Sequence, residues 1–309
     1  MNLKLSGFLV AVLLYGATCY ASGEDCDDPK AVPKGTPDVV MDGFFIGANT
    51  CAYDPDLVSS DDVPVIGGEY QDGGEPIFMV NGANTSVSNN DIRLKSIATV
   101  KHRPVIGIYN ATTDAVGELT KFVDIGNLAA NTIRREAFSR VMEGREFSVI
   151  ALSQSGFMVG RGLTLLKTDL YESFPFRYLY RQHLLNLVNV ETVGTLGMYY
   201  PDGPNYVHYV NKRDLFPLIV GAGSEASKPG RGAVIATFYY YNEDCQFGMA
   251  PLEEYPGENA DLSKDKPPVV GEEVHSVCSY AASGMDFDSL RTHAPQFGTV
   301  EVELDLSTP

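Results

Sequence analysis

Short apolar runs separated by clusters of Gly, Asn and Asp recur along the chain after residue 38. Runs of this kind, rich in β-branched and aromatic residues and bounded by turn residues, predict β-strands. We expect a mixed or antiparallel sheet, with residues 192–200 and 206–210 paired as a hairpin around a Pro-Asp-Gly-Pro turn. The expected strands are 39–48, 63–66, 77–80, 92–100, 104–109, 146–152, 157–166, 192–200, 206–210, 233–241 and 299–306.

Two stretches instead repeat their apolar residues at intervals of three and four, which is typical of amphipathic helices. Residues 115–143 form the first, with Asp114 as N-cap and Gly144 as the stop, and residues 173–188 form the second, with Ser173 as N-cap. The pattern therefore predicts a β-rich α+β domain with two main helices. The dibasic pair Arg134-Arg135 falls inside the first helix, where a solvated charge pair is favoured over a processing site.

The first 21 residues have the anatomy of a secretory signal peptide. Lys4 provides the positive start, residues 5–15 form a short apolar block, and Cys19 and Ala21 place small residues before the expected cleavage point. The apolar block is too short to span a bilayer, and we find no other apolar run of the required length. We expect a secreted, extracellular protein without a membrane span in the mature chain.

Four cysteines remain after the expected cleavage, and an even number in an oxidising compartment favours two disulfides. Three pairings are possible. We favour the local one, which joins Cys26 to Cys51 and Cys245 to Cys278 and closes two short loops. The spacing contains no Cys-x2-Cys element, so it does not predict a zinc site.

The chain also carries two N-x-[ST] sequons, at Asn84 and Asn110. In a secreted protein these predict N-linked glycans on surface loops. We expect residues 22–309 to form a single globular domain, with an irregular N-terminal arm at 22–37 and an acidic loop at 251–273. Cys245 and Cys278 bracket that loop, which argues against a linker between two domains.

The formal net charge of −17 disfavours nucleic acid as a partner. Hydrophobic residues make up 44% of the chain, enough for a substantial core. No spacing predicts a bound cofactor or metal.

The search for catalytic residues finds no recognised enzymatic motif. Ser153-Gln154-Ser155-Gly156 invites interpretation as a nucleophile, but glycine does not stand two residues to either side of one serine, so we interpret it as a turn between two strands. His275 and His293 share a region with Asp286 and Asp288, although their spacing does not require a site. The remaining histidines are His102, His183 and His208.

The residues resemble no family that we identify, and three hypotheses follow. The first is a secreted, glycosylated, acidic protein that binds an extracellular protein or a small ligand. The second is a secreted hydrolase whose site is assembled from residues far apart in the sequence, since the members of a catalytic triad need not be neighbours. The third is an extracellular structural component with Tyr-rich strands.

Overall fold

The computed structural model describes residues 26–33, 35–83, 85–111, 127–242, 260–269, 275, 277–281 and 283–306. The expected leader therefore lies outside the described residues, as do most of the acidic loop and Cys245. The Cys278 side chain is also outside them, so the predicted Cys245–Cys278 bond stays a prediction. Within the described part of the chain, no helix is long and apolar enough to cross a membrane.

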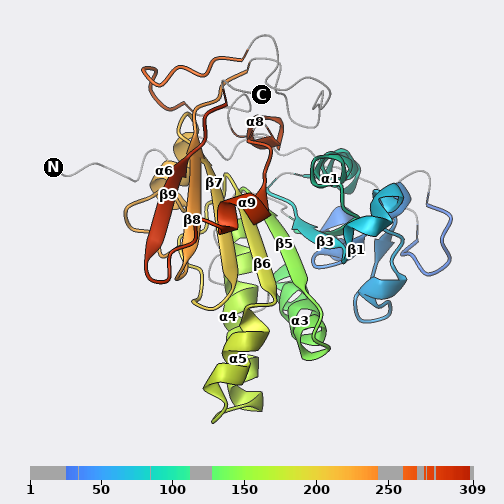
Figure 1. Cartoon of the computed structure of the whole chain (residues 1–309). Helices are drawn as coiled ribbons and strands as arrows, with labels where there is room; N and C mark the ends of the chain where they lie inside the picture. The colour runs from blue at the N-terminus through green and yellow to red at the C-terminus, as the bar shows by residue number, and fades with distance from the viewer. Residues whose placement is uncertain are drawn as a thin grey trace.

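The described strands form one mixed sheet, in agreement with the predicted α+β class (Figure 1). Its order is β2-β1-β4-β3-β5-β6-β7-β8-β9. β1 runs antiparallel to β2 and β4, and all pairs from β4 to β9 are parallel. The strands are β1 (Phe45–Ile46), β2 (Ala52–Tyr53), β3 (Ile77–Val80), β4 (Val105–Ile108), β5 (Phe147–Leu152), β6 (Val188–Val193), β7 (Asn205–Asn211), β8 (Ala233–Phe238) and β9 (Thr299–Glu303).

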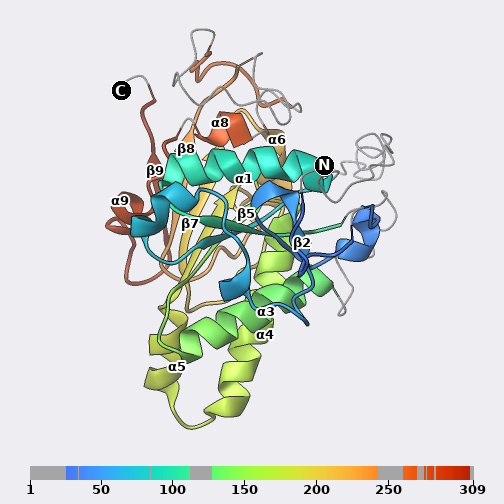
Figure 2. The ribbon, with the colours of Figure 1, turned by 90° about the vertical axis from the view of Figure 1, so that its right-hand side faces the viewer.

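Helices cover both faces of this sheet, as parallel strands require. Successive strand residues point to opposite faces, so Phe78 and Val149 pack with α3 and α4, whereas Met79 and Ile150 pack on the face covered by α1, α8 and α9 (Figures 1 and 2). The described helices are α1 (Val87–Lys101), α3 (Leu128–Met142), α4 (Ser155–Ser173), α5 (Tyr178–Leu185), α6 (Leu215–Val220), α8 (Val277–Ala281) and α9 (Phe287–Arg291). Short 3-10 turns are η2 (Asp38–Met41), η3 (Ala48–Thr50), η4 (Ser60–Asp62) and η5 (Gly68–Gly73).

Three predicted strands are wrong. Residues 92–100 belong to α1, residues 157–166 belong to α4, and residues 63–66 contain only an isolated bridge from Ile66 to Val105. Parallel neighbouring strands must be joined by a crossover connection. α1 carries the chain from β3 to β4, and α4 carries it from β5 towards β6. Glycines in α4 allow the close packing: a Cβ on Gly162 would lie 2.8 Å from the Ala130 carbonyl oxygen of α3.

The detail of two main helices is not confirmed. α3 begins at Leu128, where the Asn127 side chain accepts a hydrogen bond from the Ala130 amide, and residues 112–126 lie outside the described part of the chain. α5 is shorter than the predicted helix, since β6 begins at Val188. The predicted hairpin is also wrong: β6 and β7 are parallel neighbours.

The Cys26–Cys51 disulfide is present, as the local pairing predicts. It fastens the N-terminal arm beside β2. Two hydrogen bonds reinforce the attachment, from the Val32 amide to the Ala52 carbonyl at 2.8 Å and from the Tyr53 hydroxyl to Asp28 Oδ2 at 2.9 Å.

A charged cluster lies where β3 and β5 begin. The guanidinium of Arg140 is buried and contacts Glu75 Oε2 at 2.6 Å and Asp61 Oδ1 at 3.1 Å. Arg145 also binds both carboxylates. The pKa of Glu75 lies below its usual value of 4.5, and the pKa of Asp61 lies below its usual value of 3.8. In both cases the main cause is hydrogen bonding from Arg145, which stabilises the ionised carboxylate.

This cluster predicts a loss of stability in acid. A carboxyl group with a lowered folded-state pKa stabilises the fold above its unfolded pKa, and that contribution is lost as the pH falls through the folded pKa. We expect Glu75→Gln to lower the free energy of unfolding at pH 7 and to flatten its decline below about pH 4.5. Urea unfolding at several pH values measures both effects. Glu225→Gln, at an exposed carboxylate after α6, is the control, and equal pH profiles for the two variants would contradict the prediction.

Candidate active site

A sharp turn connects β5 to α4 and carries Ser153. β5 ends at Leu152 and α4 begins at Ser155, so the turn is very short. Ser153 has φ of 54°, in the left-handed region that non-glycine residues seldom adopt, and its side chain is partly exposed. Such strain is retained where the surrounding structure holds it, and it often marks functional residues.

Small side chains allow this turn without the glycines of G-x-S-x-G. Ala151 and Ser155 stand two residues before and after Ser153, and both are fully buried. Ser155 Oγ lies 2.8 Å from the Val80 carbonyl oxygen, and it accepts a hydrogen bond from the Leu152 amide at 2.8 Å. Ser155 thus ties the turn to β3, and the interpretation of 153–156 as a turn between two strands is wrong.

The segment that follows β3 lies directly against Ser153. A Cβ placed on Gly82 would be 2.9 Å from Ser153 Cβ and 3.5 Å from its Oγ, so only glycine permits this close approach. β3 and β5 are neighbours in the sheet. From β3 the chain continues to β4, towards one edge of the sheet, and from β5 it continues to β6, towards the other edge. Sites in sheets of this kind form at the carboxyl ends of the strands, where the order reverses.

His275 bridges Ser153 and a buried carboxylate. Its Nε2 lies 2.8 Å from Ser153 Oγ, and its Nδ1 lies 2.5 Å from Asp214 Oδ2. A carboxylate only accepts hydrogen bonds, so it favours the tautomer that carries the proton on Nδ1. Nε2 is then free to accept the proton of the Ser153 hydroxyl. We call Ser153, His275 and Asp214 the triad.

Asp214 is held by three donors. It follows β7 and caps α6, where Oδ1 accepts a hydrogen bond from the Phe216 amide at 3.0 Å. Oδ2 accepts a second bond from the Tyr280 hydroxyl at 2.7 Å, in addition to His275. Burial first, and then the charge of Asp214, holds the pKa of Tyr280 well above its usual value, so this phenol remains a donor. The Asp214 side chain is fully buried, which fixes its orientation.

Three buried amide side chains brace the turn from the side of β3 and β4. Asn81 Nδ2 donates to the Asn110 carbonyl at 2.9 Å and to that of Gly82 at 3.0 Å, and Asn81 Oδ1 accepts from the Asn110 amide at 2.8 Å. Asn110 Nδ2 donates to Gln154 Oε1 at 3.2 Å. The ends of β3, β4 and β5 are thereby locked in register around Ser153.

The positions that usually supply oxyanion donors lie beside the serine. These are the residue after a nucleophile on such a turn and the loop after the neighbouring strand. In this chain they are Gln154, which follows Ser153, and Gly82 with Ala83, in the segment that approaches Ser153 most closely. A serine, a base, an orienting carboxylate and such donors together can perform nucleophilic acyl transfer.

The residues singled out from the sequence fall mostly outside this arrangement. Of the five histidines, His275 alone joins the triad; it pairs with Asp214, whereas Asp286 caps α9. His208 is buried in β7, and burial lowers its pKa to about 4. His102 ends α1, and His183 and His293 are exposed.

The two sequons have different outcomes. Asn84 lies outside the described residues, so its glycan stays a prediction. Asn110 is fully buried at the end of β4, and its Nδ2, the atom a glycan would occupy, donates to Gln154. This burial argues against the glycan predicted at Asn110.

Sequence reasoning missed Ser153 because it required glycines. The available signal was an apolar strand followed by small-x-Ser-x-small and then a helix. It missed Asp214 because the partner of a triad histidine is chosen by the fold.

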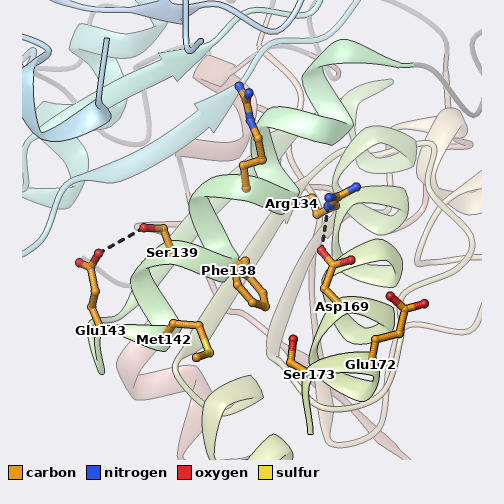
Figure 3. Close-up of a pocket in the computed structure, with 9 residues that line it drawn as sticks. Arg134, Phe138, Ser139, Met142, Glu143, Asp169, Glu172 and Ser173 are labelled. Atoms are coloured by element: carbon orange, nitrogen blue, oxygen red, sulfur yellow. Dashed lines mark hydrogen bonds and ion pairs between the residues drawn. The ribbon is translucent and has the colours of Figure 1, made fainter. Parts of the chain in front are cut away.

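A shallow hollow between α3 and α4 is distinct from the triad (Figure 3). Arg134 and Asp169 form an ion pair across it at 2.8 Å. Asp169 lies fourteen residues beyond the start of α4 at Ser155, which corresponds to roughly 20 Å along a helix. The hollow therefore does not belong to the site at the carboxyl ends of the strands.

No family model, curated protein or solved structure matches this chain. The geometry of the site therefore carries the functional argument by itself.

Tyr280→Phe tests the support of Asp214. Loss of the phenol leaves a buried carboxylate oxygen with one donor fewer, so we expect the free energy of unfolding to fall by about 1–3 kcal/mol. We also expect the downfield proton resonance of the His275–Asp214 hydrogen bond to move.

Tyr206→Phe is the matched control, because its buried hydroxyl donates to the Pro201 carbonyl at 2.7 Å, away from Asp214. It should lose stability without moving the resonance. If the resonance does not move in Tyr280→Phe, the Tyr280 hydroxyl does not support the carboxylate of Asp214 that binds His275.

Proposed function

We propose that this protein is a serine hydrolase that cleaves acyl compounds, esters or thioesters, through an acyl-enzyme. The observation that carries the proposal is the continuous hydrogen-bonded series from Ser153 Oγ through His275 to Asp214. This is the second of the hypotheses drawn from the sequence. It is favoured over a binding protein because a binding surface has no need for a strained serine beside a buried imidazole–carboxylate pair.

The geometry supports a two-stage mechanism. In the first stage Ser153 Oγ attacks the substrate carbonyl carbon while His275 Nε2 takes the hydroxyl proton, and the carbonyl oxygen becomes an oxyanion that faces the Gln154 amide. The C–O or C–S bond to the leaving group then breaks, and His275 returns the proton to that group. Asp214 orients the imidazole and stabilises its positive charge throughout.

The second stage restores the serine. Water attacks the acyl carbonyl carbon of the ester on Ser153 while His275 Nε2 accepts one of its protons. The bond between the acyl carbon and Ser153 Oγ breaks, His275 gives its proton to the serine, and the carboxylic acid leaves. Atoms and charges balance with water as the only co-reactant.

The order of the three residues also supports the proposal. Ser, Asp and His follow one another in the chain, with the serine on a strand-to-helix turn of a largely parallel sheet. This is the arrangement found in α/β-hydrolases, whereas chymotrypsin-like and subtilisin-like proteases use other orders. The analogy concerns architecture, and a fold of this kind hosts many substrates.

The proposal includes an extracellular setting. A disulfide joins Cys26 to Cys51, and disulfides persist in oxidising compartments. The signal peptide expected from residues 1–21 is consistent with this setting.

Fluorophosphonate labelling tests the proposal, since such probes react with activated serines. We expect the wild-type chain to be labelled at Ser153 and to hydrolyse p-nitrophenyl acetate. Ser153→Ala should abolish labelling and lower kcat/KM by about 10⁴-fold or more, because the nucleophile is gone.

Ser139→Ala, at an exposed serine of α3, is the matched control and should behave as wild type. An unlabelled wild type, or a Ser153→Ala variant that is still labelled at the same rate, would refute the hydrolase proposal.

A further inference from the structure

The helix that begins beside the triad has an unusual composition. α6 spans Leu215–Val220, immediately after Asp214, and its sequence is Leu-Phe-Pro-Leu-Ile-Val, without one polar side chain. Pro217 is its single buried residue. A helix with apolar residues on every side is normally buried all round, yet this one leaves apolar side chains in contact with solvent.

Three of its side chains form one face that starts at the triad. Ile219 is exposed, Leu215 and Phe216 are partly exposed, and the three lie within one helical turn of one another on the side away from Pro217. The Phe216 ring packs on the His275 ring with centroids 4.8 Å apart, and 48% of Ile219 is exposed. We call these three residues the α6 face.

The orientation of this face is fixed by hydrogen bonds. Asp214 caps the start of α6, the Leu215 amide donates to the Val269 carbonyl at 3.1 Å, and the Gly223 amide donates to the Pro217 carbonyl at 3.1 Å. A Cβ on Gly221 would lie 2.7 Å from Pro217 Cα, so the buried side of the helix is closely packed. The α6 face therefore cannot turn inward without breaking the cap on Asp214.

We propose that the α6 face binds the hydrocarbon chain of the acyl group, so that the preferred substrates are esters or thioesters of medium- or long-chain fatty acids. This inference rests on the proposed hydrolase function. An acyl group on Ser153 lies next to His275, and its chain then has a continuous apolar path over Phe216 to Ile219. Continuity with the triad favours a substrate chain over a protein partner as the occupant.

A second group of exposed apolar side chains lies far from the triad, so exposure by itself does not identify the acyl-chain site. Phe176 is 98% exposed and Leu179 is 81% exposed, where α4 gives way to α5. Both views place α5 at the end of the molecule opposite α6 and α8 (Figures 1 and 2). These residues are remote from the triad and provide a matched control.

The test compares p-nitrophenyl esters of acetate, butyrate, octanoate and dodecanoate with the full chain. Burial of each methylene contributes about a three- to fourfold gain, so kcat/KM of the wild type should rise steeply from acetate to octanoate. Ile219→Ser should lower kcat/KM for octanoate by roughly tenfold relative to kcat/KM for acetate, because the acetyl group is too short to reach Ile219. Leu179→Ser should change neither.

The outcomes separate the two proposals. Failure of the wild type to hydrolyse any ester, acetate included, refutes the hydrolase function. Hydrolysis of acetate with a flat chain-length profile, or an equal loss on acetate and octanoate in Ile219→Ser, overturns the acyl-chain assignment alone. A wild type that is dimeric on gel filtration and becomes monomeric in Ile219→Ser, with an unchanged profile, identifies a second copy as the occupant and also overturns it.

Discussion

The buried carboxylate of Asp214 is the contact on which the candidate site depends. One oxygen caps α6, and the other accepts hydrogen bonds from both His275 and Tyr280. One side chain therefore joins the start of α6 to the segment 275–280, which is distant from it in the sequence. A carboxylate removed from water is tolerated only when donors surround it, so the same bonds that make its burial possible also orient the imidazole towards Ser153.

The sheet supplies the other half of the site. Parallel alignment of β3 and β5 brings Gly82 and Ser153 together at one edge, and the absence of a side chain on Gly82 permits the contact. At the opposite ends of the same strands, Arg140 and Arg145 gather Glu75 and Asp61. The charged cluster stabilises the base of the sheet, whereas the polar groups at the carboxyl ends hold a strained turn.

The segments that the sequence placed correctly are those whose local pattern matches their surroundings. Residues 77–80, 104–109 and 146–152 were predicted as strands because they are compact apolar runs, and they form β3, β4 and β5. Residues 157–166 were predicted as a strand although they form the first half of α4. Glycines and β-branched residues in that segment weaken the helical signal, and packing against α3 overrides it.

The sequence by itself determined the presence of a sheet with helices, without deciding between a mixed and an antiparallel one, and it favoured the pairing of Cys26 with Cys51, because apolar runs and short loops are local properties. It contained Ser153, Asp214 and His275 but could not relate them, since nothing in their spacing records which side chains meet. The tertiary structure decided that relation. Parallel strands align their carboxyl ends at one edge, and the loops after β5, β7 and β8 therefore converge there, where hydrogen bonds of 2.8 Å and 2.5 Å join the three residues.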